Sequence, residues 1–141
     1  MSETNGFRYL LITPAEQSHT LRQIITDALQ EVGLDPILLE ETIVPGTSIV
    51  EPVQQAIARA DIIIVDLTVS NPNVMYEVGF AHALRKPVLP IVQPGVNHVP
   101  SDIAGYLFFV YDPSAPDELR RNIQTWAVRH HNKRMQGELS G

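Results

Sequence analysis

The segment Asn71–Gly79 carries the side chains of this chain that are best suited to chemistry. It reads Asn-Pro-Asn-Val-Met-Tyr-Glu-Val-Gly, in which Asn71 can cap a helix and Pro72 fits the first helical position. Glu77 then lies about a turn inside that helix. At about 100° per residue, it shares a stripe with the apolar side chains of Val74, Phe80, Ala81 and Leu84. We therefore expect Glu77 to face inward, where a desolvated carboxylate can act as a nucleophile or a general base.

Structural roles are the alternative at each of these positions. The Glu77 carboxylate could bind backbone amides or a neighbouring arginine such as Arg59. Asp66 could hold a ribose hydroxyl or a catalytic water, or it could cap the following turn through an Asx bond. Tyr76 could stack on a ligand or only pack. Gly79, a glycine inside a helix, indicates the close approach of another backbone, and we expect tight packing on a sheet to explain it.

Apolar runs of strand length alternate with amphipathic stretches of helix length, which indicates βαβ units. Strands are expected near residues 7–12, 36–39, 61–67, 88–92 and 107–111, and helices near 18–33, 49–60, 73–85 and 115–129. The run 61–67 is apolar at consecutive positions, as in a parallel sheet covered by helices on both faces. The predicted fold class is α/β: a single-domain, three-layer α/β/α fold with a five-stranded parallel sheet in the flavodoxin-like order 2-1-3-4-5.

That order places a ligand crevice at the carboxyl ends of the first and third strands, where the chain order reverses. Two loops meet there, Thr13–Gln17 after the first strand and Thr68–Asn73 after the third. We expect the substrate-binding residues around Glu77 to be Thr13, Pro14, Asp66, Thr68, Asn71, Asn73 and Tyr76.

Several uses of this architecture are excluded by missing residues. The chain has neither G-x-x-x-x-G-K-[ST] nor G-x-G-x-x-G, which excludes a P-loop and a dinucleotide-binding fingerprint. It has no cysteine, and its five histidines do not follow a metal-ligand spacing. We expect no metal site and no resident cofactor.

Length and charge set further bounds. The 141 residues fit one domain, and we expect a flexible N-terminus over 1–6, the α/β domain over 7–130 and a polar C-terminal tail over 131–141. Residues 1–119 hold five of the ten basic and fifteen of the sixteen acidic side chains, so a nucleic-acid partner is not expected. No apolar run approaches the roughly 18 residues of a membrane helix, and no signal peptide is recognisable. We expect a cytoplasmic protein without a membrane partner.

A family resemblance rests on residues 60–88. Asp61–Thr68, Asn71–Leu84 and Lys86–Val88 resemble the signature of nucleoside 2-deoxyribosyltransferase-like proteins, a superfamily that includes bacterial TIR-like domains. The resemblance implies cleavage or transfer at an N-glycosidic bond of a 2'-deoxynucleoside, a nucleotide or NAD. In the last case NAD would be a substrate and not a cofactor. The resemblance also implies that Glu77 is the catalytic carboxylate, that Asp66 contacts the sugar or the base, and that the loop after the first strand lines the same pocket.

The chain departs from that signature at two places. Thr13-Pro14 stands where the transferases usually have Gly-Pro, and Arg85 replaces the glycine before Lys-Pro. The resemblance further implies a homo-oligomer. A non-catalytic module that senses a nucleotide or binds a protein is the alternative function.

Overall fold

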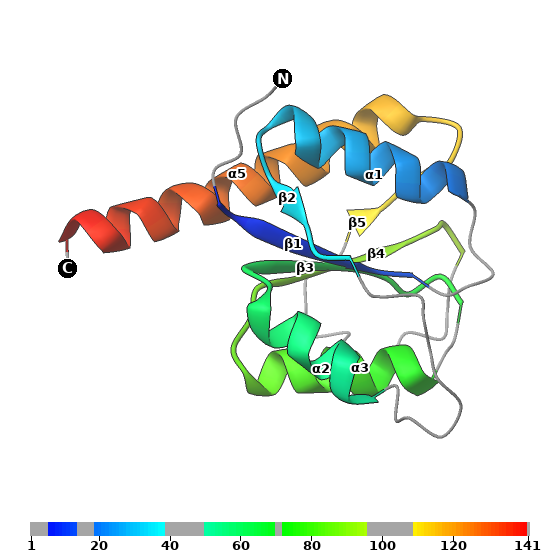
Figure 1. The fold of residues 1–141 in the computed structure, drawn as a ribbon. Coiled ribbons are helices and arrows are strands. Elements are labelled where there is room, and N and C mark those ends of the chain that lie inside the picture. Colours follow the sequence, from blue (N-terminus) through cyan, green and yellow to red (C-terminus); the bar gives the residue numbers. More distant parts are fainter. Residues whose placement is uncertain (1–5, 14–18, 39–49, 70–71, 96–108, 141) are drawn as a thin grey trace.

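The computed structural model describes residues 6–13, 19–38, 50–69, 72–95 and 109–140. Strands and helices alternate along the chain (Figure 1). Their bounds are β1 Arg8–Ile12, α1 His19–Glu31, β2 Asp35–Pro36, α2 Val50–Arg59, β3 Ile62–Asp66, α3 Pro72–Ala83, β4 Val88–Val92, β5 Phe109–Val110 and α5 Pro116–Ser140. Among the described residues, no helix is both long enough and apolar enough to cross a membrane.

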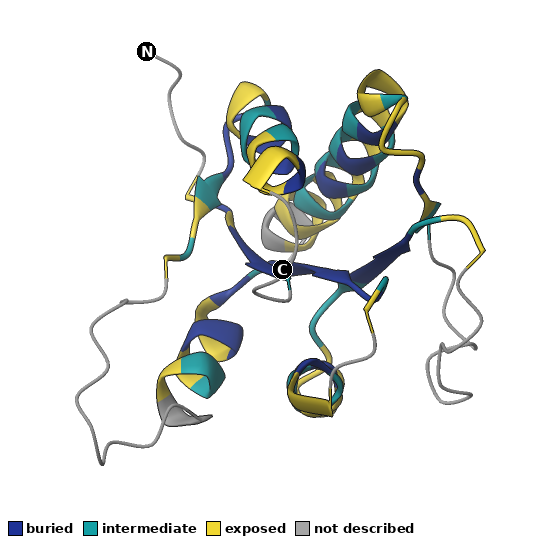
Figure 2. Ribbon diagram, turned by 90° about the vertical axis from the view of Figure 1, so that its right-hand side faces the viewer, coloured by how far each residue is buried: buried dark blue, intermediate teal, exposed yellow. Residues whose placement is uncertain are grey.

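The strands form one five-stranded parallel sheet in the order β2-β1-β3-β4-β5. Helices α1 and α5 cover one face, and α2 and α3 cover the other (Figure 2). Since nearly all crossovers between parallel strands are right-handed, this order fixes which helices share a face. The predicted fold class is confirmed.

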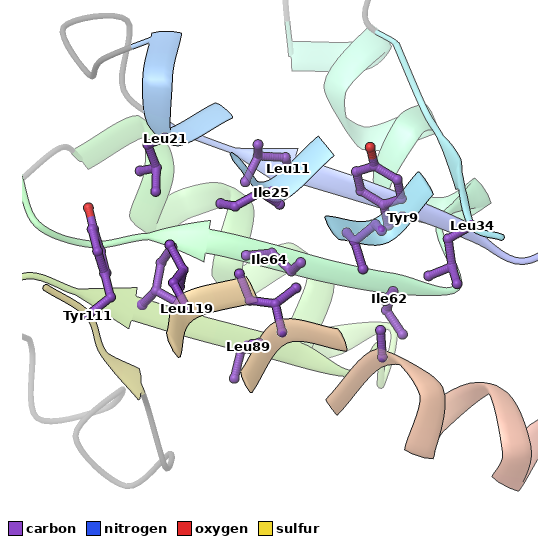
Figure 3. Packing of buried hydrophobic residues seen from close by; sticks show 14 of the residues in the cluster. Tyr9, Leu11, Leu21, Ile25, Leu34, Ile62, Ile64, Leu89, Tyr111 and Leu119 are labelled. Atoms are coloured by element: carbon purple, nitrogen blue, oxygen red, sulfur yellow. The ribbon is translucent and has the colours of Figure 1, made fainter. Parts of the chain in front are cut away.

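The central strand β3 separates two layers of the hydrophobic core. Its side chains are all buried and alternate between the faces, as the pleat of a strand requires. Ile62 and Ile64 pack beneath α1 and α5 (Figure 3), while Ile63 and Val65 pack against α2 and α3. Burial of each such side chain stabilises the fold by about 1.5–3 kcal/mol. The same alternation directs Asp66, the last residue of β3, toward the α1/α5 face.

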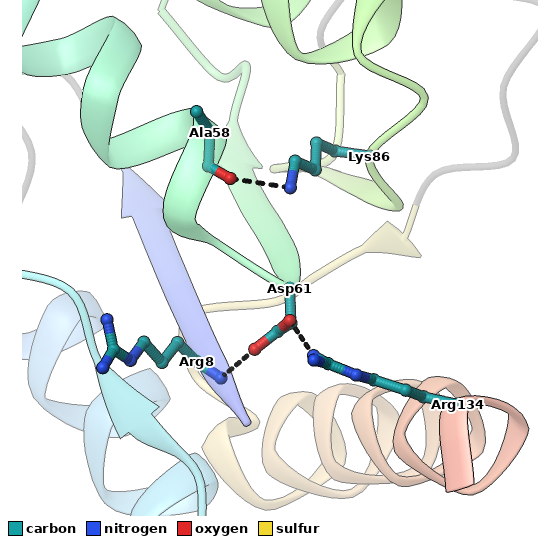
Figure 4. Close-up of polar contacts among 5 residues, drawn as sticks. All are labelled: Arg8, Ala58, Asp61, Lys86 and Arg134. Atoms are coloured by element: carbon teal, nitrogen blue, oxygen red, sulfur yellow. Dashed lines mark hydrogen bonds and ion pairs between the residues drawn. The ribbon is translucent and has the colours of Figure 1, made fainter. Parts of the chain in front are cut away.

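Helix α5 is longer than predicted. The sequence pattern placed its end near Arg129, but the helix continues to Ser140, so residues 131–140 form its last turns. Arg, Lys, Met and Gln are good helix formers and no proline interrupts the segment. Contacts with the body also hold it: Arg134 pairs with Asp61 (Figure 4), and the His131 ring lies 5.0 Å from that of Phe7.

The outer strands are shorter than predicted. β2 spans two residues, Asp35–Pro36, and β5 spans Phe109–Val110. The N–H groups of Asp35 and Ile37 donate to the carbonyls of Phe7 and Tyr9, so the missing N–H of Pro36 between them faces the outer edge of the sheet, where a proline is tolerated. Residues 39, 107 and 108 of the predicted strands lie outside the described residues.

Candidate functional site

Glu77 lies on the flank of α3 that is turned toward α2. The face of α3 that packs on the sheet is formed by Val74, Val78 and Ala81, all buried. Glu77 is half-buried and lines a cavity of about 140 Å³ between the two helices. The cavity is lined by Val53, Gln54 and Ile57 of α2 and by Asn73, Tyr76, Glu77 and Phe80 of α3.

The carboxylate of Glu77 is partly desolvated and has no pairing partner among the described residues. Within the described part of the chain it has neither a hydrogen-bond donor nor a cation as a partner, and Arg59 does not reach it. Burial raises the pKa of Glu77 above its usual value. The predicted inward orientation is met only in part: Glu77 is half-buried and faces a cavity beside the sheet, and it does not pack on the sheet itself.

Apart from Glu77, the cavity walls combine apolar and neutral polar groups. Val53, Ile57 and Phe80 are apolar, while Gln54 and Tyr76 meet across the two helices, where Gln54 Nε2 donates to the Tyr76 hydroxyl at 3.3 Å. Lysine and arginine are absent from the described lining. At about 140 Å³, the cavity is smaller than most ligand pockets, which usually measure about 300–1,000 Å³, so it has room for a single ring. Because no cation lines the described walls, they suit an uncharged ring better than a phosphate.

Asp66 has the opposite environment. It is fully buried on the α1/α5 side of the sheet, where Oδ1 accepts hydrogen bonds from the Thr68 N–H at 3.0 Å and the Thr68 hydroxyl at 2.6 Å. Oδ2 accepts a hydrogen bond from the Tyr111 hydroxyl at 3.2 Å. Of the two roles considered for Asp66, the structure shows the Asx bond.

Thr13 also contacts the α1/α5 side, since its hydroxyl accepts a hydrogen bond from Arg22 of α1 at 2.7 Å. The structure therefore divides the predicted site residues. Asn73 and Tyr76 lie with Glu77 at the cavity, whereas Thr13, Asp66 and Thr68 make contacts on the other face. Pro14 and Asn71 lie outside the described residues.

The prediction for Gly79 is wrong. This glycine is exposed, and a Cβ built on it would meet no atom of the described residues within 4 Å. Gly79 follows Val78 in the helix and faces solvent, so no neighbouring backbone requires a glycine there.

Sequence reasoning missed Gln54, Gln93 and Tyr111. Gln54 belongs to no motif. The strand order puts α2 and α3 on the same face of the sheet, so a polar residue on α2 could have been considered as a neighbour of Glu77. Gln93 and Tyr111 follow the ends of β4 and β5 and so lie at the same edge of the sheet as Asp66. Among the described residues, no group of three or more His, Cys, Asp or Glu side chains could hold a metal ion.

Comparisons with known proteins give a match in structure alone. No family model matches the chain, and no curated protein matches its sequence.

Three solved structures with the same fold are informative. The CMP N-glycosidase BcmB of Clostridium botulinum aligns with a TM-score of 0.64 at 19% identity, covering 84% of this chain and 98% of that chain. The TIR domain of the Toll-related receptor TRR-2 of Hydra magnipapillata aligns with a TM-score of 0.62 at 16% identity, covering 82% and 97%. The 2-deoxyribosyltransferase of Bacillus psychrosaccharolyticus aligns with a TM-score of 0.56 at 15% identity, covering 80% and 90%. The chain therefore has the fold that these proteins share, and the resemblance noted in its sequence is confirmed at the level of the fold.

Proposed function

We propose that this protein cleaves or transfers at an N-glycosidic bond of a nucleoside-type ligand, with Glu77 as the catalytic carboxylate. The observation that carries the proposal is the environment of Glu77. It is half-buried in a cavity, its pKa is raised, and no partner among the described residues neutralises it. Such a carboxylate costs folding stability, and a functional site explains why it is kept.

The chemistry follows from the position of the carboxylate. A Glu77 oxygen attacks the anomeric carbon, or stabilises an oxocarbenium ion there, while the carbon–nitrogen bond breaks and its electron pair leaves with the base. A nucleoside or nucleotide base takes up a proton from solvent as it departs, whereas the nicotinamide of NAD leaves as a neutral base without one. Water then releases the sugar by hydrolysis, or a second base accepts it by transfer.

The cavity walls around Glu77 are uncharged, which favours binding of a ring of the ligand over binding of its phosphate. An apolar surface with amide and phenol groups suits the ribose or base ring of a 2'-deoxynucleoside, a nucleotide or NAD. Two of the structural neighbours, a CMP N-glycosidase and a 2-deoxyribosyltransferase, are by name proteins that act on such compounds. Assembly into a homo-oligomer stays a prediction.

The test compares wild type with Glu77→Gln, which keeps the shape of the side chain and removes its charge. Each is incubated at high concentration with NAD, CMP, the four 2'-deoxynucleoside 5'-monophosphates and their nucleosides, and released base is measured by chromatography. We expect wild type to release a base and Glu77→Gln to lose about 10³-fold or more of the rate, as for removal of a covalent or electrostatic catalyst. Glu118→Gln, a change of the same kind at an exposed position of α5, serves as the control and should keep full activity.

A binding module is the second candidate, and the content of the cavity favours it. Apart from the Tyr76 phenol, Glu77 is the one ionisable group in the described lining, so a separate general acid for the leaving base is absent from that part of the wall. This candidate predicts ligand-dependent thermal stabilisation of wild type without release of base. Full turnover by Glu77→Gln would contradict the catalytic assignment.

A further inference from the structure

A closed hydrogen-bond network lies at the carboxyl edge of the sheet, on the face opposite the Glu77 cavity. Its members are Asp66 at the end of β3, Thr68 just after it, Gln93 just after β4 and Tyr111 just after β5. Thr68 and Tyr111 bond directly to the fully buried carboxylate of Asp66, and Gln93 is joined to it through these two residues.

Four hydrogen bonds of this network have a defined direction, and in a fifth contact the hydroxyls of Thr68 and Tyr111 lie 3.4 Å apart, where either oxygen can donate. The hydroxyl of Thr68 donates to Asp66 Oδ1 at 2.6 Å and accepts from the Gln93 N–H at 3.1 Å. The hydroxyl of Tyr111 donates to Asp66 Oδ2 at 3.2 Å and accepts from Gln93 Nε2 at 3.3 Å. Burial is the largest cause of a raised pKa of Tyr111, so this hydroxyl keeps its proton as a donor at neutral pH. The buried side-chain nitrogen and oxygen atoms of the described residues all have partners.

The network fixes the start of the connection between β3 and α3. The N–H of Leu67 donates to the Ile91 carbonyl at 2.9 Å, and the N–H of Thr68 is held by Asp66. The next described element along the chain is α3, which begins at Pro72 and carries Asn73, Tyr76 and Glu77. Thr68 precedes the first residue of α3 by only four positions, so the place where Thr68 is held limits where α3 can begin.

We propose that Tyr111, acting through Asp66 and Thr68, is a positioning residue for the Glu77 cavity: the hydroxyl cluster at the ends of β3, β4 and β5 sets the placement of the first turns of α3. The part of this inference that concerns catalysis rests on the function proposed above. Networks of this kind are worth more than their separate bonds because each member orders the next.

The test uses substitutions that delete one hydroxyl and keep side-chain volume. Tyr111→Phe and Thr68→Val remove network hydroxyls, and Thr68→Ser is the conservative variant that restores one. Tyr9→Phe is the matched control, because Tyr9 is also a buried tyrosine on the α1/α5 face, and its hydroxyl bonds to Thr26 on α1, away from the β3–α3 connection.

The first readout is amide hydrogen exchange of residues 72–80, which does not depend on activity. We expect exchange there to rise by about three- to tenfold in Tyr111→Phe and Thr68→Val, as for the loss of one or two buried hydrogen bonds that limit local opening. Thr68→Ser should stay close to wild type, and Tyr9→Phe should leave this segment unchanged relative to the rest of the sheet. Unchanged exchange in both Tyr111→Phe and Thr68→Val, or an equal rise in Tyr9→Phe, would overturn the proposal.

The second readout separates this inference from the proposed function. If wild type releases base, we expect Tyr111→Phe to lower kcat by about tenfold with a smaller change in KM, since a misplaced carboxylate weakens the transition state more than ground-state binding. Unchanged kcat and KM in this variant, with Glu77→Gln inactive, would refute the positioning role and leave the proposed function intact. If no substrate is turned over, the proposed function fails while the exchange measurement still decides the positioning of α3.

Discussion

Two carboxylates of one motif show, at the scale of single residues, how environment assigns a role. Asp66 and Glu77 belong to the same strand–loop–helix stretch. Asp66 accepts three hydrogen bonds in a fully buried site, whereas Glu77 is half-buried without a partner among the described residues. A satisfied buried carboxylate holds structure together, and an unsatisfied one is available for a ligand.

The raised pKa of Glu77 predicts that this side chain destabilises the fold at neutral pH. An acid whose pKa is higher in the folded than in the unfolded protein binds more protons when folded, so stability falls as the pH rises between the two pKa values. We therefore expect Glu77→Gln to have a higher melting temperature than wild type at pH 7. The difference should grow as the pH rises from the ordinary glutamate value through the raised one and then stay constant.

Thermal unfolding from pH 4 to pH 8 measures this difference. Glu118→Gln, an exposed change in the first turn of α5, is the control and should not raise the melting temperature. A Glu77→Gln variant that is less stable than wild type at pH 7 would show that the carboxylate has a stabilising partner.

Helical periodicity predicted only in part how Glu77 is oriented, since this side chain is half-buried beside the buried stripe of α3. Nearness in sequence misled for Asp66 and Thr68. Both precede α3 by a few residues, and the crevice argument grouped them with Glu77. The pleat of β3 sends alternate side chains to opposite faces, which puts Asp66 with Ile62 and Ile64, away from the α3 side. Counting this alternation from the buried strand would have separated them. Tyr111 could not be assigned in this way because its partner lies 45 positions away along the chain.

At the scale of elements, the C-terminus of α3 ends in a Schellman motif with an unfavourable residue. Arg85 has φ of 58°, in the left-handed region that favours glycine. The N–H of Lys86 donates to the Ala81 carbonyl at 3.0 Å and that of Arg85 to the His82 carbonyl at 2.9 Å. The arginine that replaces the glycine of the family signature therefore leaves the backbone motif intact, but its Cβ makes the left-handed conformation less favourable.

We expect Arg85→Gly to raise the free energy of unfolding by about 0.5–1 kcal/mol, because glycine removes the left-handed strain at the cost of greater freedom in the unfolded chain. Arg85 has no hydrogen-bond or ion-pair partner among the described residues that the substitution would remove. Urea unfolding measures the change.

Gly33 provides the converse control, since it ends α1 with φ of 85° and the same pair of backbone hydrogen bonds. Gly33→Ala should lower the free energy of unfolding by about 1 kcal/mol or more. If both substitutions changed the free energy of unfolding in the same direction, the assignment of strain to the left-handed position would be wrong.

The elements themselves were predictable where hydrophobic periodicity is strong. Strand β4 has the predicted bounds, and α1 ends before Gly33 as expected. The length of α5 was missed because its last turns follow no apolar stripe: they are held by Arg134 and His131 against distant residues of the body. A tertiary contact of this kind leaves no local pattern in the sequence.

At the scale of the whole molecule, different polar interactions lie at the amino and the carboxyl edge of the sheet. The carboxyl edge carries the Asp66 network. At the amino edge, the Asp61 carboxylate accepts a hydrogen bond from the Arg8 N–H at 2.7 Å and pairs with Arg134 of α5 (Figure 4). Lys86 Nζ also donates to the Ala58 carbonyl at 2.9 Å, which joins the ends of α3 and α2. These contacts stabilise the amino edge of the sheet, and none of them involves the cavity to which we assign the proposed function.

This separation predicts that Arg134→Ala weakens the fold without changing catalysis. The substitution removes the ion pair with Asp61, whose side chain is 19% exposed, and the contact of the guanidinium 5.6 Å from the centre of the Phe7 ring. Both contacts are partly open to solvent, so we expect the free energy of unfolding to fall by only about 0.5–1.5 kcal/mol in urea denaturation. The kcat and KM of base release should stay at wild-type values, because Arg134 is not part of the Glu77 cavity.

Arg121→Ala is the matched control for that prediction, since Arg121 is an exposed arginine of the same helix without a partner among the described residues. Its removal should change stability by less than about 0.5 kcal/mol. A fall in kcat with Arg134→Ala at unchanged stability would mean that α5 communicates with the cavity across the sheet. In that case the two edges could not be treated as independent, and the long helix would have to be included in the functional site.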